Sequence, residues 1–405
     1  MRNRQITRST VFSFLLLCLL FTLPASSHDP ITTSVTFNKE VIRILQRNCL
    51  GCHAPGKIKN DIPLTTYEEA RPWAKAIKEE VLEKRMPPYQ AMIGYGEFQN
   101  PYMLPKRDLE LLISWVEGGA PRGDAKELPK ELVPAANWSF GTPELNLQPD
   151  EMVTIPAGEG LYEACVKLPT TFKQDQWARA IEFIPGQASS VLGAEFYLQK
   201  QCGGNCSGGE KIGEWVPGQA TTMLPDNTGI LLPANGCLTM KIQYRKGEQE
   251  IKDHSILGVY RAKDQVTQQA QRVMIKPLPR TVPAGAKLQR VKASYVVQDN
   301  AQAVSIRPLL FPLAKSIEAT AFYPDGTVEV LIAAKEYRHT WQPSYFYKRP
   351  VRLPAKTRIE VTAYFDNSDQ NPNLSDDPKP KKIGDPLIEL TLAKPGSTKS
   401  STARN

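Results

Sequence analysis

The sequence predicts a multidomain protein in which a small all-α domain is followed by two all-β sandwich domains of jelly-roll-like form. Apolar residues recur at helical spacing between residues 34 and 124, and helical periodicity disappears after about residue 137. Short apolar runs then alternate with Pro- and Gly-containing turns up to residue 395. The 405 residues are enough for two or three domains that each bury their own core.

The N-terminus has the composition of an export signal, which we expect to span residues 1–27. Arg2, Arg4 and Arg8 precede an apolar run over 11–23, and small residues follow at 25–27. This order is typical of a secretory signal, and the run is too short to be a stable membrane span. Since no later apolar run could cross a bilayer, we expect no transmembrane segment and a periplasmic or secreted location.

The charge of the chain does not indicate a particular partner. The formal net charge is +8, and three of the positive charges belong to the signal. Lysines cluster only at Lys379, Lys381 and Lys382, among prolines and beside Asp376 and Asp377. This pattern favours a solvated loop, so we expect no nucleic-acid partner.

Three helices are expected in the α domain, which we place at residues 34–124. Apolar side chains recur at helical spacing over 38–48. A second stretch, rich in Glu, Lys and Ala, runs over 66–84 and ends before Pro87-Pro88. The third runs over 106–117, with Gly118-Gly119 as its stop.

Residues 49–53, Cys-Leu-Gly-Cys-His, follow the first expected helix. Two thiols at this spacing can form thioethers to both vinyl groups of one haem, and the adjacent histidine then faces the iron. The C-x-x-C pattern also occurs in zinc sites and thiol redox centres. The sequence has no second C-x-x-C at zinc-ribbon distance and no β-α-β setting around this one. One covalent haem c, held by Cys49 and Cys52 with His53 as axial ligand, is therefore the favoured interpretation.

The second axial ligand is expected to be a thioether, the usual partner of histidine in an electron-transfer haem. Met86 is the main candidate, because Pro87-Pro88 stiffens the chain after it. Met92 and Met103 are competitors, for which a place in the core is the simpler interpretation.

Residues 49–53, 85–88 and 111–121 together resemble the small class I type cytochrome c domains that many bacteria fuse to other periplasmic modules. The resemblance covers roughly the first quarter of the mature chain. It implies a one-electron carrier with His53 and Met86 as the axial ligands of the haem iron.

Four cysteines remain outside the signal and the haem motif: Cys165, Cys202, Cys206 and Cys237. An oxidising compartment favours their pairing. Among the three possible connectivities we favour Cys202 with Cys206, around a tight glycine turn, and Cys165 with Cys237. Four free or metal-binding thiols remain an alternative.

Two sandwiches in tandem are expected after a Pro- and Lys-rich linker over 125–136. The first is placed at residues 137–272 and the second at 273–395, with strands in the latter over 316–322, 328–332 and 358–364. The Ser- and Thr-rich tail, 396–405, is expected to be disordered.

Both sandwiches resemble the paired domains of the copper type II, ascorbate-dependent monooxygenases, the peptidylglycine hydroxylating family. The matching framework and turn segments are 137–141, 177–186, 215–218, 253–255, 323–326, 341–342 and 366–368. Chemistry in that family needs two copper sites built mostly from imidazoles with one thioether.

The positions expected for those copper ligands hold other residues: Leu192-Gly193, Gln243-Tyr244-Arg245, Leu309-Leu310-Phe311 and Leu390. The chain has four histidines, of which only His254 and His339 lie in the expected sandwiches. Two imidazoles cannot supply two such sites, so we expect no copper and no copper monooxygenase activity. His254 and His339 are interpreted as surface or hydrogen-bonded histidines.

The sequence therefore predicts a periplasmic monohaem c-type cytochrome that carries single electrons. The sandwiches would act as a docking module for a periplasmic redox protein. One alternative is a haem-dependent oxidoreductase with an open iron site and a substrate cleft in the sandwiches. Another is a haem-bearing structural or sensory module.

Overall fold

The computed structural model describes residues 32–88, 91–99, 102–130, 138–170, 172–200, 206, 208–309, 312–335, 341–371, 373–374 and 379–395. The predicted signal (1–27), Cys202, His339 and the tail (396–405) lie outside the described residues, as do residues 131–136 of the predicted linker. No helix among the described residues combines the length and apolar character that crossing a membrane requires.

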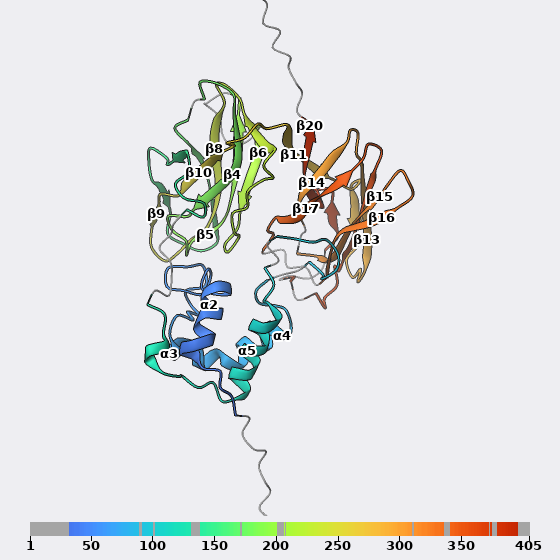
Figure 1. The fold of residues 1–405 in the computed structure, drawn as a ribbon. Coiled ribbons are helices and arrows are strands. Elements are labelled where there is room, and N and C mark those ends of the chain that lie inside the picture. The colour runs from blue at the N-terminus through green and yellow to red at the C-terminus, as the bar shows by residue number, and fades with distance from the viewer. Residues whose placement is uncertain are drawn as a thin grey trace, which may run out of the picture.

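The N-terminal part of the chain forms short helices joined by long irregular segments, and it lies below the two β-rich parts in Figure 1. The helices are η1 (Phe37–Val41), α2 (Ile42–Asn48), α3 (Tyr67–Ala70), η2 (Arg71–Trp73), α4 (Ala74–Leu82), α5 (Lys106–Glu117) and η3 (Ala125–Glu127).

The predicted second helix is broken where the sequence contains a proline. The capping box of Thr66 and Glu69 begins α3, but Pro72 lies in the one turn of 3-10 helix that separates α3 from α4. Proline has no backbone N–H to continue the α-helical ladder. The third predicted helix, in contrast, is confirmed as α5 over the predicted residues.

The expectation of a separate, small all-α domain is wrong. The structure is predominantly β, and the longest helix of the N-terminal part has 12 residues. Residues 91–99, between α4 and α5, leave the helical part altogether. Ala91 and Phe98 form β-bridges with Ala334 and Tyr347 of the second sandwich, and both belong to the core of that sandwich. The helical part thus shares a segment with the second sandwich, which the local helical periodicity did not indicate.

The first sandwich consists of two packed layers. One layer contains β1 (Leu145–Leu147), β10 (Ile256–Arg261), β4 (Gln176–Ile184) and β7 (Thr228–Leu232). The other has the strand order β3 (Leu161–Lys167), β8 (Cys237–Arg245), β5 (Val191–Gln199) and β6 (Glu210–Trp215). A short pair is formed by β2 (Val153–Ile155) and β9 (Ile251–Asp253).

The second sandwich repeats this plan. One layer contains β11 (Gln268–Ile275), β20 (Ile388–Pro395), β14 (Ala301–Pro308) and β17 (Tyr345–Leu353). The facing sheet has the order β13 (Gln289–Val296), β18 (Arg358–Phe365), β15 (Ala314–Phe322) and β16 (Val328–Lys335). The short pair is β12 (Arg280–Val282) with β19 (Lys381–Ile383). The three strands predicted here from sequence are confirmed as β15, β16 and β18.

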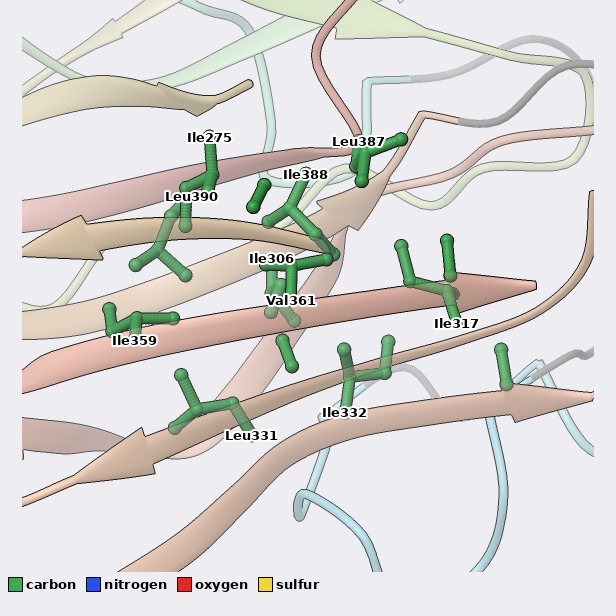
Figure 2. Packing of buried hydrophobic residues seen from close by; sticks show 14 of the residues in the cluster. Ile275, Ile306, Ile317, Leu331, Ile332, Ile359, Val361, Leu387, Ile388 and Leu390 are labelled. Carbon is green, nitrogen blue, oxygen red and sulfur yellow. The ribbon is translucent and has the colours of Figure 1, made fainter. Parts of the chain in front are cut away.

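Alternation of inward and outward side chains explains the core of the second sandwich. In β18 every second residue is buried, so Ile359 and Val361 point inward from one sheet. Ile306 and Leu390 meet them from the opposite layer, as Figure 2 shows. The position at which the copper-enzyme resemblance would place a methionine ligand, Leu390, is thus a fully buried core residue.

The two sandwiches share one eight-stranded sheet. Its order is β1-β10-β4-β7-β11-β20-β14-β17, and β7 pairs with β11 in parallel at Thr228–Gln268 and Gly229–Gln269. β11 and β20 accordingly lie at the junction of the two sandwiches (Figure 1). The predicted boundary between residues 272 and 273 falls inside β11.

A buried cluster of six charges also joins the sandwiches. Glu195, Lys211 and Glu214 come from β5 and β6 of the first sandwich, and Arg272, Arg307 and Glu389 come from β11, β14 and β20. Lys211 Nζ lies 3.0 Å from a Glu389 carboxylate oxygen, and Arg307 lies 3.6 Å from Glu214. Three cations face three carboxylates, so the cluster is balanced and attaches one sandwich to the other.

Candidate functional site

The residues of the predicted haem motif form a compact turn at the end of α2. Cys49 is the residue that ends the helix, and its carbonyl accepts hydrogen bonds from the backbone N–H groups of Cys52 and His53 at 3.0 and 2.9 Å. Leu50 points into the helical core and is 3% exposed, whereas Cys49 and Cys52 are half-buried. The turn therefore buries its apolar residue and leaves both thiols partly accessible, on one short segment.

His53 is held by the irregular segment that follows it. Its Nδ1 lies 3.0 Å from the carbonyl oxygen of Ile62, and its own carbonyl accepts a hydrogen bond from the Leu64 backbone N–H. A carbonyl oxygen can only accept, so Nδ1 is the donor in this contact, and in the neutral form of the ring Nε2 then has the lone pair. A backbone partner on one ring nitrogen is how ligating histidines are oriented.

Both thiols of the motif have a raised pKa. They are not bonded to each other, and burial raises the pKa of the Cys49 thiol to about 12, with a smaller contribution from Cys52. Burial also raises the pKa of Cys52, although Lys57 and Lys59 oppose the shift.

The first sandwich reaches the motif through the loop after β6. A Cβ atom added at Gly218 would lie 3.3 Å from Cys52 Sγ, so the backbone of this loop is in close contact with the second cysteine. Gly218 has φ +78°, a conformation that favours glycine. The neighbouring Pro217 carbonyl accepts a hydrogen bond from the indole N–H of Trp341 at 2.9 Å. Residues 216–218 and Trp341 were matched to a family framework from sequence, but their proximity to Cys52 was not predicted.

The candidate axial methionine, Met86, lies just after α4 and is half-buried. The Arg85 and Met86 backbone N–H groups both donate to the Glu80 carbonyl, at 2.8 and 3.1 Å. Met92, by contrast, donates its backbone N–H to Ala333 of β16 at 2.7 Å and thus belongs to the segment bound to the second sandwich. Met103 is half-buried just before α5.

The helical part has an aromatic core next to α5. Trp115 is fully buried, and its indole N–H donates to the Pro121 carbonyl at 3.0 Å. Phe37 contacts both Trp115 and Tyr67, at ring-centroid distances of 6.1 and 5.6 Å. These residues fix α5 against η1 and α3.

The predicted disulfides are corrected. Cys165 is bonded to Cys206, which excludes both Cys165–Cys237 and Cys202–Cys206. In the β3–β8 ladder Cys165 lies opposite Lys241, four residues along the strand from Cys237, so those two sulfurs cannot meet. Cys237 is also disulfide-bonded. The Cys165–Cys206 bond is of the kind found in proteins that fold outside the cytoplasm.

The alternative of four free or metal-binding thiols is wrong, because Cys165, Cys206 and Cys237 are disulfide-bonded. Among the described residues there is no group of three or more His, Cys, Asp or Glu side chains that could hold an ion. Three of the copper-ligand positions of the sequence resemblance lie on β5, β8 and β20, where Gln243 and Arg245 face solvent. In the fourth, Leu309 follows β14, and residues 310–311 lie outside the described residues. His254 Nε2 lies 2.9 Å from the Pro149 carbonyl oxygen, which confirms it as a hydrogen-bonded histidine.

No family model and no curated protein matches this sequence. Among solved structures, the chain is similar to the major capsid protein P2 from Bacteriophage PM2, with 10% identity, 63% of this chain and 98% of that chain covered, and a TM-score of 0.31. It is also similar to N-glycanase F (PNGase F), with 11% identity, 62% and 95% coverage, and a TM-score of 0.31. These likenesses carry no assignment of activity or ligand.

Proposed function

We propose that the chain carries one covalent haem c at residues 49–53 and passes single electrons to a redox partner outside the cytoplasm. The observation that carries the proposal is the hydrogen bond between His53 Nδ1 and the Ile62 carbonyl, which leaves Nε2 available beside two thiols that form no disulfide with each other. Cys49 and Cys52 would hold the haem through thioethers, and His53 would be the proximal ligand.

Bound haem would supply a centre that gains and loses one electron without breaking a bond. The protein's own residues would tune it. Because Nδ1 of His53 donates to a neutral carbonyl rather than to a carboxylate, the imidazole remains a neutral ligand. Leu50 and Ala54, both buried beside the motif, would exclude water from the protein side of the attachment turn.

The sandwiches are proposed as a docking module that keeps the haem-bearing segment in a fixed place. Two features support this role. The loop at Gly218 contacts Cys52, and residues 91–99 are hydrogen-bonded into the second sandwich. No copper-dependent activity is proposed, because the sequence offers too few histidines for such sites.

The test is to purify the exported protein and measure covalent haem, iron and copper, together with the near-infrared absorption of the oxidised form. We expect one haem per chain and the weak methionine-to-iron charge-transfer band. In Met86→Ala the haem should remain attached and the band should disappear. Met92→Ala and Met103→Ala are matched controls that should keep it.

The outcomes separate the alternatives. Absence of covalent haem would overturn the proposal. A high-spin haem that lacks the band and binds carbon monoxide would instead favour a haem-dependent oxidoreductase with an open site. Stoichiometric copper would contradict the assignment of the sandwiches to docking.

A further inference from the structure

The segment that follows Met86 is built into the second sandwich at both of its ends. The Met92 backbone N–H donates to the Ala333 carbonyl of β16 at 2.7 Å, next to the Ala91–Ala334 bridge. Toward the other end, the Gln99 N–H donates to the Phe346 carbonyl and the Lys348 N–H donates to the Glu97 carbonyl, each at 2.7 Å. These contacts make residues 91–99 an additional piece of the sandwich edge.

Side chains reinforce the backbone contacts. Phe98 is 3% exposed and lies between Tyr345 and Tyr347, with ring centroids 5.2 and 5.1 Å away. Tyr102 extends the cluster, because its ring is 5.0 Å from Trp341 and 6.1 Å from Tyr345. Burial of an aromatic ring of this size makes Phe98 the main apolar anchor of the segment.

Gly96 allows the segment to lie this close to the sandwich. It has φ +83°, and an added Cβ would lie 2.6 Å from the Leu331 carbonyl oxygen and 2.5 Å from the Phe98 ring. No residue with a side chain fits at this position without displacing the backbone. The close packing of residues 91–99 against the second sandwich therefore depends on glycine at position 96.

The other side of Met86 is fixed to α4. Arg85 and Met86 donate their backbone N–H groups to the Glu80 carbonyl, and the Arg85 guanidinium contacts the carboxylates of Glu79 and Glu80 at 3.0 Å. Only four residues lie between Met86 and Ala91. The methionine is thus placed between an anchor in the helical part and an anchor in the second sandwich.

We propose that the second sandwich positions Met86 as the distal haem ligand, with Phe98 as the positioning residue. This inference rests on the proposed haem function. A thioether is a weak, neutral ligand, and the chain around it decides how much of the time it lies at the iron. Anchoring the flanking segment in a folded sandwich lowers the entropy that the loop would otherwise lose when Met86 binds.

The test compares Phe98→Ala with Phe365→Leu in the full-length haem protein. Phe365 is a fully buried core residue of the same sandwich, but its ladder partners are Gln289 and Ala314 of β13 and β15, whereas the backbone hydrogen bonds described above join residues 91–99 to β16 and β17. Three quantities are measured: the methionine-to-iron band, carbon monoxide binding to the reduced form, and hydrogen exchange at the Arg85 and Met86 amides.

Phe98→Ala is expected to keep the covalent haem, to lose the band, to admit carbon monoxide faster and to exchange both amides faster. Phe98→Leu should restore the band in large part, and Phe365→Leu should leave it unchanged. If Phe98→Ala keeps the full band, or if Phe365→Leu removes it equally, the sandwich does not position Met86. If the wild-type protein has no covalent haem, the proposed function itself is wrong, and the inference falls with it.

Discussion

The pKa of the Glu214 carboxyl depends on charged residues from both sandwiches. Burial alone would raise its pKa, but Arg272, Lys211 and Arg307 together hold the pKa of this carboxyl well below its usual range. Ser344 adds a hydrogen bond from its hydroxyl. Lys211 lies on the same strand as Glu214, but Arg272 and Arg307 are contributed by β11 and β14, which are far away in the chain. No local pattern could have predicted this site.

Replacing Glu214 with Gln is expected to destabilise the protein by about 3 kcal/mol at neutral pH, because it leaves three cations facing only two carboxylates in the cluster. The lowered folded-state pKa means that Glu214 contributes stability above the unfolded-state pKa of 4.5 and loses it as pH falls through the folded-state pKa. The difference between wild type and Glu214→Gln, measured by thermal unfolding across this range, should therefore shrink as pH falls.

Glu110→Gln is the control for this experiment, since Glu110 forms an exposed pair with Lys106 at 3.6 Å. It should change stability by less than about 0.5 kcal/mol at any pH. An equal effect of the two substitutions would contradict the role assigned to the buried cluster.

Two glycine substitutions separate the effect of the contact between Gly218 and Cys52 from the effect of backbone strain. Gly218→Ala is expected to cost about 1–2 kcal/mol for placing alanine at positive φ, and to displace the Cys52 sulfur as well. Gly285 has nearly the same φ, +77°, and no atom within 4 Å of an added Cβ, so Gly285→Ala reports the strain alone. Only Gly218→Ala should change the rate at which Cys52 is alkylated in haem-free protein. Equal rates in both variants would show that the contact is unimportant.

At the scale of elements, periodicity predicted well wherever a helix or strand is amphipathic and uninterrupted. α5 was predicted to its ends, and the strands of the second sandwich were placed within a few residues. Errors occurred where one residue or one distant contact decides the outcome. Pro72 breaks the second helix, and residues 91–99 pair with strands more than 200 residues away. Pairing between such distant segments cannot be predicted from the residues of either segment alone.

The Cys165–Cys206 disulfide connects two elements, because it joins β3 to the segment before β6. Its sequence separation of 41 residues predicts that removing it costs about 4 kcal/mol through the gained freedom of the unfolded chain. The double variant Cys165→Ser with Cys206→Ser should show this loss in chemical unfolding under oxidising conditions. Under reducing conditions, where both proteins also lose the bond of Cys237, the wild-type protein and the variant should have the same stability. A loss below about 1 kcal/mol would indicate that native-state strain cancels the constraint.

The parts of the molecule are joined by the shared sheet, by the buried charge cluster and by residues 91–99 of the helical part. The sandwich-like strand pattern was predictable from alternation and turns, whereas the continuous sheet was not. The β7–β11 pairing is parallel and involves only two residue pairs, so it has no distinct hydrophobic pattern of its own. A joint sheet and a buried charge cluster together predict that the sandwiches unfold as one cooperative unit.

Ile242→Ala tests this cooperativity. Ile242 is fully buried in β8 of the first sandwich, and the substitution should cost about 2–5 kcal/mol. If the sandwiches form one unit, amide exchange in the β11–β20 ladder of the second sandwich should accelerate as much as exchange in β8. Acceleration confined to the first sandwich would mean that the two unfold separately.

The closeness of Gly218 to the second cysteine has a consequence for how the protein is made. Haem is bulky, and a synthase that attaches it must reach both thiols of residues 49–53. Once residues 216–218 are folded against Cys52 Sγ, that access is restricted. If the chain receives haem as proposed, attachment has to come first, while the later-exported residues are still unfolded, and completion of the first sandwich then encloses the new thioether.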